Sequence, residues 1–485
     1  MKTCIKKLFL LPALIGGLGL LPVGRVTAQT FTNLHSFSAL SGPSNATNSD
    51  GANPYAGLIL SGNTLYGTAL NGGSFGDGTV FAVHTNGTGF TNRHSCTATA
   101  GSNSTNSDGS HPYAGLILSG TTLYGTASHG GSSGYGTVFA VNTDGTGFTN
   151  RHTFTGSSDG TYPNALILSG TTLYGTAYGG GSSGYGTVFA VNTDGTGFTN
   201  LHSFTATSGP FPSTNSDGAY PAAGLILSGN TLYGTAQHGG SSGYGTVFAV
   251  NTNGTGFTNR HSFNSSDGAY PYAGLILSGN TLYGTASQGG SAGYGTVFAV
   301  NTDGTGFTNR HSFTAVGLNP SGYNTNSDGA NPYAGLILSG NTLYGTAYQG
   351  GSSGYGTMFA VHTDGVGFTN LHSFTYGSDG AYPFAGLILS GNTLYGTAYQ
   401  GGSAGLGTIF SLSLPPPPQL TIIRSGANVI LTWPANAAGF TLQSTTSLLS
   451  PAVWITNSPA PVVVNGQNAV TNSVSGTQKF YRLSQ

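Results

Sequence analysis

Charged residues are scarce in this chain of 485 residues. Only 5% of its residues are Asp, Glu, Lys or Arg, against about 25% in ordinary soluble domains. Glutamate is absent, so all 12 acidic residues are Asp, and no Lys lies between Lys7 and Lys479. The formal net charge is −1. This composition lacks the basic face that nucleic-acid binding requires, so nucleic acid is not an expected partner.

Cysteine is equally rare, with Cys4 and Cys96 only. If residues 1–28 are removed, Cys96 is left alone and an intrachain disulfide is excluded. Cys96 stands where the other repeats carry Phe, so we expect it to act as a small buried hydrophobe. Beyond the N-terminus no apolar run approaches the ~20 residues that span a bilayer, so we expect no transmembrane anchor in the mature chain.

Residues 1–28 have the pattern of a secretory signal peptide. Three lysines precede an apolar stretch over Leu8–Val23, and Val26-Thr27-Ala28 is a small-residue cleavage site. The sequence therefore predicts cleavage after Ala28 and a secreted or cell-surface protein. The alternative is an uncleaved membrane anchor.

Glycine is abundant, at 83 residues, and it recurs within a tandem repeat. The segment LYGTA occurs seven times at spacings of 50 to 61 residues, close to the ~40–50 residues of one β-propeller blade. The tyrosines of these segments are Tyr66, Tyr124, Tyr174, Tyr233, Tyr283, Tyr344 and Tyr395.

Each repeat offers four segments typical of β-strands, rich in β-branched and aromatic residues and bounded by turn residues. In the first repeat they are Gly57–Leu60, Thr64–Ala69, Gly78–Val83 and Phe90–Ser95. The first two are joined through SGN and the last two through NTNG or NTDG, both typical of hairpins. A Gly-rich loop such as GGSSGYG joins the second to the third. Successive connections therefore alternate between two ends of the blade.

The first motif after the predicted cleavage site, FTNLHSF at Phe31–Phe37, is an orphan copy of the fourth strand. The last repeat ends near Leu412 and lacks that strand. A ring in which the first strand completes the last sheet removes the unpaired edges of an open sheet array. We therefore predict an all-β fold: a seven-bladed β-propeller over residues 29–413, closed by the N-terminal strand.

The segment SDGAYPYAGLILSGNTLYGTASQGGSAGYGTVFAVNTDGTGFTNRHSF, Ser266–Phe313, resembles the GloVer (Gloeobacter/Verrucomicrobia-type) tandem repeat. The elements LYGT, GGxxGxGTVF and SDGxxP recur in order, and the resemblance covers roughly residues 31–413. It implies repeated β structure and export from a bacterial cell. It implies no established enzymatic activity.

The composition changes after Leu412. Pro415–Pro418 indicates a stiff linker over residues 414–419. Residues 420–485 contain both tryptophans and further strand-like runs, LTIIR, NVILTW, FTLQST, VWIT, PVVVN and KFYRL. They predict a small β-sandwich of fibronectin-III or immunoglobulin type, with a role in attachment or spacing.

Seven aspartates recur in S-D-G, shortly before the innermost strand of each blade. They form either a ring for a cation or polar ligand near the channel mouth, or turns in which Asp accepts backbone hydrogen bonds. The turn interpretation is favoured because all copies are equivalent. These residues are Asp50, Asp108, Asp159, Asp217, Asp267, Asp328 and Asp379.

Seven histidines recur in the fourth strand, on the face that also carries Phe. We expect them to be structural, lying between blades and hydrogen-bonded to an Asp within each blade, rather than to bind metal. No metal site or cofactor is predicted. These residues are His35, His94, His152, His202, His261, His311 and His372.

Variable loops on a rigid scaffold are where binding usually occurs. The Gly-rich loops and the links between blades share one end of the propeller, and four of these links are long (38–49, 97–107, 205–216 and 314–327). Tyrosines in the Gly-rich loops are suited to sugar rings. The candidates are Tyr135, Tyr185, Tyr244, Tyr294 and Tyr355.

These features favour a secreted, non-catalytic binding or adhesion protein, with polysaccharides or cell-surface glycans as partners. One alternative is a structural surface or matrix protein without a small ligand. The other is a polysaccharide-degrading enzyme, which would require a carboxylate pair that the repeated Asp residues do not single out.

Overall fold

A computed structural model describes residues 29–42, 46–416, 418–435, 440–449, 453–457, 459–474 and 478–484. The predicted signal peptide, residues 1–28, lies outside the described residues, as do parts of the first long link and of the proline-rich linker. The chain divides into two compact units, of which one is Phe31–Leu412 and the other includes Ser413–Ser484. The described segments form strands and turns without any helix, and hence no helix able to cross a membrane.

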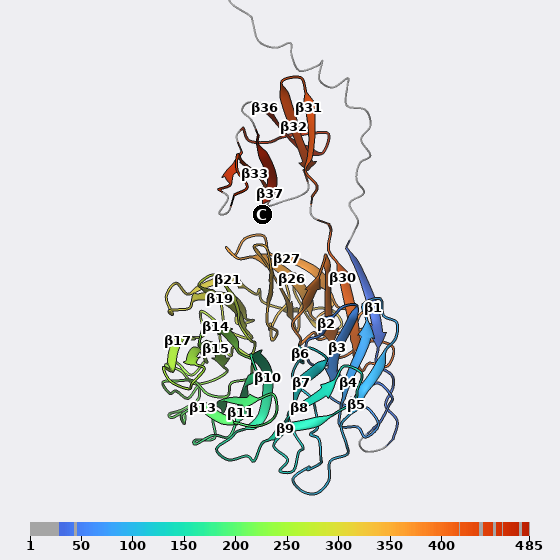
Figure 1. Cartoon of the computed structure of the whole chain (residues 1–485), viewed down its shortest axis with the longest axis vertical. Coiled ribbons are helices and arrows are strands. Elements are labelled where there is room, and N and C mark those ends of the chain that lie inside the picture. Colours follow the sequence, from blue (N-terminus) through green and yellow to red (C-terminus); the bar gives the residue numbers. More distant parts are fainter. Residues whose placement is uncertain are drawn as a thin grey trace, which may run out of the picture. The chain divides into compact units, whose positions relative to one another are not determined.

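The described part of Phe31–Leu412 folds into seven four-stranded antiparallel sheets arranged as a propeller-like ring (Figure 1). The first sheet in chain order consists of β2 (Ile59–Ser61), β3 (Thr64–Ala69), β4 (Thr79–His84) and β5 (Thr91–Ser95). The second consists of β6 (Ile117–Ser119), β7 (Thr122–Ala127), β8 (Thr137–Asn142) and β9 (Thr149–Thr153). The third consists of β10 (Thr161–Ser169), β11 (Thr172–Gly179), β12 (Thr187–Asn192) and β13 (Thr199–Ser203).

The next three sheets repeat this order. The fourth consists of β14 (Ile226–Ser228), β15 (Thr231–Ala236), β16 (Thr246–Asn251) and β17 (Thr258–Ser262). The fifth consists of β18 (Ile276–Ser278), β19 (Thr281–Ala286), β20 (Thr296–Asn301) and β21 (Thr308–Ser312). The sixth consists of β24 (Ile337–Ser339), β25 (Thr342–Ala347), β26 (Thr357–His362) and β27 (Thr369–Ser373).

The last sheet combines the two ends of this unit. It consists of β28 (Ile388–Ser390), β29 (Thr393–Ala398), β30 (Thr408–Ser413) and the N-terminal strand β1 (Thr30–Ser36). Strand β1 pairs with β30, and the Phe37 amide donates to the Gly407 carbonyl at 3.1 Å. The orphan FTNLHSF motif therefore takes the place that was predicted for it.

The threonine of each LYGTA segment joins adjacent sheets. Its buried hydroxyl donates to a carbonyl of the segment around Ala114 in the second sheet and its equivalents in the others, which leads into the next sheet's inner strand, at 2.7–3.3 Å. In the last of these bonds Thr397 donates to the carbonyl of Ala56 at 3.0 Å, which links the last sheet to the first. Seven such bonds therefore run around the ring.

Apolar residues of neighbouring sheets form the core between them. One cluster contains Val188 and Phe204 from the third sheet and its outgoing link, together with Leu232 and Phe248 from the fourth sheet. The glycine of LYGTA leaves room for the phenylalanine ring, because a Cβ on Gly234 would lie 2.6 Å from Phe248. Cys96 takes the place that Phe204 holds in its own repeat and is buried, as predicted, and burial raises the pKa of its thiol.

The structure differs from the predicted strands in a few places. The inner strands are mostly only three residues long, although β10 extends over Thr161–Ser169 with a register shift. One long link carries an unpredicted hairpin of β22 (Gly317–Leu318) and β23 (Asn324–Thr325).

The C-terminal unit contains two sheets among its described residues. One consists of β31 (Thr421–Ser425), β32 (Asn428–Pro434), β36 (Gln467–Ser473) and β35 (Val462–Val464). The other consists of β34 (Ile455–Thr456), β33 (Thr441–Thr445) and β37 (Phe480–Ser484). Leu431, Trp433, Leu442 and Val470 form a core shared by the two sheets. Strand β36 is absent from the predicted runs, although the Asn465-Gly466 turn before it is a hairpin signal.

Candidate ligand-binding cavity

The repeated His and Asp residues are hydrogen-bonded to each other. In all seven copies the histidine Nε2 lies 2.7–3.2 Å from an Asp Oδ2. The second Asp oxygen accepts from the second residue after the fourth strand, as Asp217 does from the Thr205 hydroxyl. Burial alone would raise the pKa of Asp217, but the bonds from His202 and Thr205 outweigh it and hold that pKa below 3.8. The carboxylate is thus ionised, and Nε2 of His202 carries the donated proton.

The prediction that this pair lies within one blade is wrong. Each His lies on an outer strand, whereas its Asp lies in the link that leads to the next sheet. The His ring also stacks on a Phe of the next outer strand, as His202 does on Phe257 with centroids 3.7 Å apart. The seventh stack, of His372 on Phe31 at 4.1 Å, joins the sixth sheet to the last through β1. The histidines therefore connect neighbouring sheets.

The predicted position of the Asp residues near the channel mouth is also wrong. The link between sheets runs from an outer strand to the next inner strand, and Asp lies at the outer end of that link, bonded to an outer-strand His. Both carboxylate oxygens have partners within the protein in all seven copies, which favours the turn interpretation. Among the described residues no group of three or more His, Cys, Asp or Glu is placed to hold a metal.

The tyrosines of the Gly-rich loops lie beside the links between sheets. Their backbone carbonyls accept hydrogen bonds from link residues with positive φ; for example, the amide of Tyr382, with φ of 56°, donates to Tyr355. Tyr135 is 38% exposed, whereas the other four candidate tyrosines are half-buried. The loops and links therefore share one end of the ring, as predicted.

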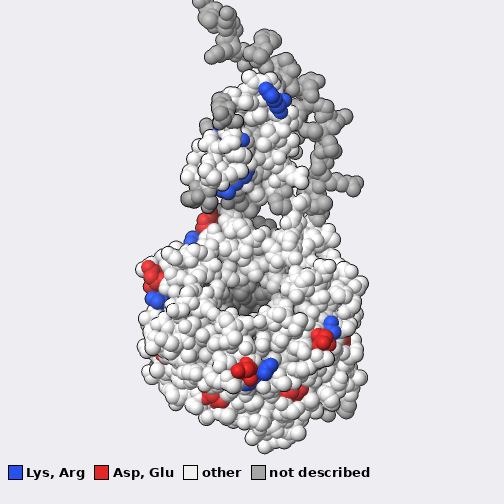
Figure 2. Space-filling view, viewed as in Figure 1, with Lys and Arg blue, Asp and Glu red and all other residues white. Residues whose placement is uncertain are grey.

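A cavity of about 140 Å³ lies at the centre of the ring. Figure 2 shows the corresponding hollow, whose visible rim carries no charged residue. All seven repeats line the cavity with the segment directly before the inner strand. The first residue after the proline of SDGxxP differs between the repeats: it is Tyr55, Tyr113, Asn164, Ala222, Tyr272, Tyr333 or Phe384.

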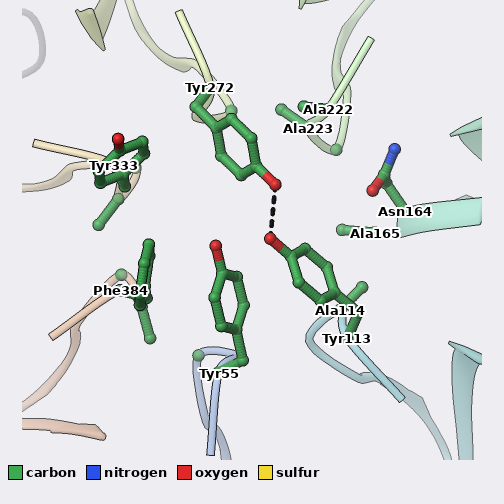
Figure 3. A pocket seen from close by; sticks show the side chains of 17 residues that line it. Tyr55, Tyr113, Ala114, Asn164, Ala165, Ala222, Ala223, Tyr272, Tyr333 and Phe384 are labelled. Atoms are coloured by element: carbon green, nitrogen blue, oxygen red, sulfur yellow. Dashed lines mark hydrogen bonds between the residues drawn. The ribbon is translucent and has the colours of Figure 1, made fainter. Parts of the chain in front are cut away.

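Five of these seven residues form an aromatic wall (Figure 3). Tyr55 stacks between Tyr113 and Phe384, with centroid distances of 4.0 and 4.3 Å. The hydroxyls of Tyr113 and Tyr272 are 2.5 Å apart and hydrogen-bonded. Burial raises the pKa of Tyr55 and of Tyr113 above 10, so both phenols remain neutral. The wall therefore offers apolar ring faces and uncharged hydroxyls.

The third and fourth repeats leave a gap in this wall. The third repeat is one residue shorter between Pro163 and Leu166, so Asn164 takes the place that Ala114 holds in the second repeat and no residue takes the place of the ring. In the fourth repeat Ala222 stands where the ring would be (Figure 3). Asn164 is 7% exposed and its Nδ2 donates to the Pro221 carbonyl at 2.9 Å, which fixes the orientation of the amide. Its Oδ1 accepts no hydrogen bond from the described residues and faces the cavity. An accessible acceptor whose orientation is fixed suits a hydroxyl-bearing ligand.

The sequence reasoning did not predict the cavity residues, because they differ between repeats and it rested on residues common to every repeat. The signal that could have revealed them is a position that varies between otherwise similar repeats. Within the context P-x-A-G the position x varies from Tyr to Phe and Ala, and the third repeat has the shorter P-N-A-L instead, which is unusual for a segment that serves only the repeat.

Residues 102–216, 213–329 and 321–425 match the Gloeobacter/Verrucomicrobia repeat. The chain belongs to this repeat family. The matches overlap and together span most of the propeller-like unit. No curated protein matches the chain.

Several solved structures resemble this repeat protein at low sequence identity. A proposed 6-phosphogluconolactonase from Bacteroides uniformis is 17% identical with a TM-score of 0.45, covering 74% of this chain and 98% of that one. One from Bacteroides fragilis is 19% identical with a TM-score of 0.44, covering 73% and 94%. An oligogalacturonate lyase from Vibrio parahaemolyticus is 9% identical with a TM-score of 0.44, covering 80% and 97%.

Proposed function

We propose that this protein is a secreted, non-catalytic binding protein for neutral carbohydrate. In this proposal the seven sheets are the blades of one closed propeller, and the central cavity holds one sugar ring. The observation that carries it is the cavity itself, which combines an aromatic wall, an oriented acceptor at Asn164 and no charged residue.

A sugar ring is chemically complementary to both the aromatic wall of this cavity and the Asn164 amide opposite it. A pyranose has apolar C–H faces, which pack on aromatic rings, and hydroxyl edges, which need hydrogen-bond partners. Tyr rings supply an apolar body with a polar end, and the Asn164 Oδ1 supplies an acceptor opposite them. A volume near 140 Å³ is close to that of a cavity that holds one benzene ring.

The lining residues also favour binding over hydrolysis. Glycoside hydrolysis uses a pair of carboxyl groups on either side of the bond that breaks. The cavity lining has no carboxylate, and the seven repeated Asp residues are bonded to histidines at the outer strands.

The remaining regions fit an extracellular binding protein. Residues 1–28 would direct export, with cleavage after Ala28. Residues 420–485 would form a small β-sandwich that attaches the propeller or holds it at a distance from a surface. Tyr135, Tyr185, Tyr244, Tyr294 and Tyr355 would add contacts at the rim of the same end.

A glycan array probed with the purified full-length protein tests this function. We expect saturable binding to neutral glycans that changes little between low and high salt, because no charge lines the cavity. The variant Ala222→Tyr should abolish binding by filling the gap, and it should fold, because Tyr occupies this position in four other repeats. Asn230→Thr, an exchange that also occurs between repeats, lies at a turn at the opposite end and serves as the control.

Two outcomes would overturn the proposal. Binding by Ala222→Tyr as tight as that of the unaltered protein would place the ligand elsewhere. A silent array would favour a structural surface protein without a small ligand.

A further inference from the structure

One sector of the ring carries aromatic residues from its rim to the central cavity. Starting at the rim, Tyr323 lies 4.9 Å from Tyr355, and Tyr355 lies 5.7 Å from Tyr382. Tyr348 then lies 4.9 Å from Tyr382 and 4.3 Å from Phe384, all distances being between ring centroids. Phe384 is part of the cavity wall, so contacts between aromatic side chains are continuous from the surface to the cavity.

This aromatic track, defined as Tyr323, Tyr355, Tyr382, Tyr348 and Phe384, is accessible and uncharged. Tyr323 is 42% exposed, and Tyr376, which lies 5.2 Å from Tyr355, is 40% exposed. The other residues of the track are half-buried. Burial and the neighbouring tyrosines raise the pKa of Tyr355 to about 12, so its phenol remains neutral.

The track is specific to the sheets formed by β24–β27 and by β28–β30 with β1. Tyr348 corresponds to Ser128 and Ser287 in other repeats, and Tyr382 corresponds to Asn53 and Asn331. A repeat that needs only to fold therefore accepts polar residues at both positions. Folding of the repeat therefore does not require aromatic rings at these two positions.

A second aromatic group makes no aromatic ring contact with the cavity wall among the described residues. Tyr185 and Tyr178 both pack against Tyr220, with centroids 5.3 and 5.0 Å apart. The residue next to this group at the cavity is Ala222, which has no ring to continue the contact. This group stands at the same repeat positions as Tyr355, Tyr348 and Tyr382 and so provides a matched control.

We infer that the track binds a linear neutral oligosaccharide, with one sugar ring in the central cavity and the adjoining rings on Tyr348, Tyr382 and Tyr355. This inference rests on the proposed function and adds the ligand class, a chain rather than a single sugar. Successive aromatic faces suit successive apolar ring faces, and no charged residue on the track favours an ionic polymer.

Calorimetric titration with array-identified glycans of increasing length tests the inference. For the unaltered protein the affinity should rise from the single sugar or disaccharide to the longer chain. The double variant Tyr348→Ser/Tyr382→Asn, which uses residues found in other repeats, should lose about tenfold in affinity for the longer chain. Its affinity for the shortest ligand should stay the same. The matched control Tyr178→Ser/Tyr220→Asn should bind every length like the unaltered protein.

The outcomes separate this inference from the proposed function. If Ala222→Tyr abolishes binding but the track variant binds long chains normally, the proposed function is supported and the inferred binding role of the track is wrong. Equal losses of affinity in the track variant and the control variant would also contradict the inferred role of the track. If a proline-rich peptide bound through the track and no oligosaccharide bound the protein, both the track inference and the proposed function would be overturned.

Discussion

At the scale of single residues, the repeat uses the same side chains seven times for structure. The histidine bonds an Asp at the junction of two sheets and stacks on a Phe of the next sheet. The sequence predicted a structural His on the Phe-bearing face, because residue alternation along a strand fixes the face. It did not place the Asp correctly, because closeness in sequence to the inner strand says nothing about which end of the link a residue occupies.

Replacing His202 with Leu should lower stability by about 1–3 kcal/mol, since the Asp217 carboxylate loses a partner in a mostly buried position. Chemical denaturation of the two proteins measures the difference. The same change at the exposed His84 should alter stability by about 0.5 kcal/mol or less. Equal effects at the two positions would argue against a structural role for His202.

Acid should destabilise the fold in two steps. Burial lowers the pKa of His152 below 6.5 despite its bond to Asp159, and hydrogen bonds hold the pKa of Asp217 below 3.8. In both cases the unfolded chain binds protons at a higher pH than the folded chain, so stability falls as pH falls below each unfolded value.

Thermal unfolding between pH 8 and pH 3 checks these two steps. The melting temperature should fall below about pH 6.5 and again below about pH 3.8. His152→Gln should show a smaller first step than the unaltered protein. A melting temperature that rises on acidification would show that the expected direction of the pH dependence is wrong.

At the scale of elements, the four strands of each repeat were predicted from turn residues and from segments rich in β-branched and aromatic residues. The Thr64–Ala69 strand matches the prediction residue for residue. Strand β36 was missed because its sequence, QNAVTNS, is polar. The inner strands are short because the preceding P-x-A-G segment lines the cavity instead of pairing along its whole length.

The glycine of LYGTA should be intolerant of a side chain. In Gly234→Ala the new Cβ would lie 2.6 Å from the Phe248 ring and 2.8 Å from Leu225, so we expect a loss of about 1–3 kcal/mol in denaturant unfolding. Gly229→Asn is the control, because Gly229 has φ of +58°, a conformation that Asn tolerates, and open space around it. A Gly234→Ala protein as stable as this control would refute the packing argument.

At the scale of the whole molecule, ring closure could be predicted and the cavity could not. Counting strand copies was enough to pair β1 with the last sheet. The cavity depends on seven segments, from Tyr55 to Phe384, meeting at one axis, and no local pattern in the sequence shows that meeting. The variation of one position between otherwise similar repeats was the available clue.

Hydrogen–deuterium exchange of the peptide covering Thr30–Phe37 tests ring closure most directly, and the central cavity depends on that closure. The amides of β1 should exchange as slowly as those of its counterpart β13, because both strands pair along the outer edge of a sheet. If β1 exchanged at the rate of an unfolded peptide while β30 stayed protected, the ring would be open.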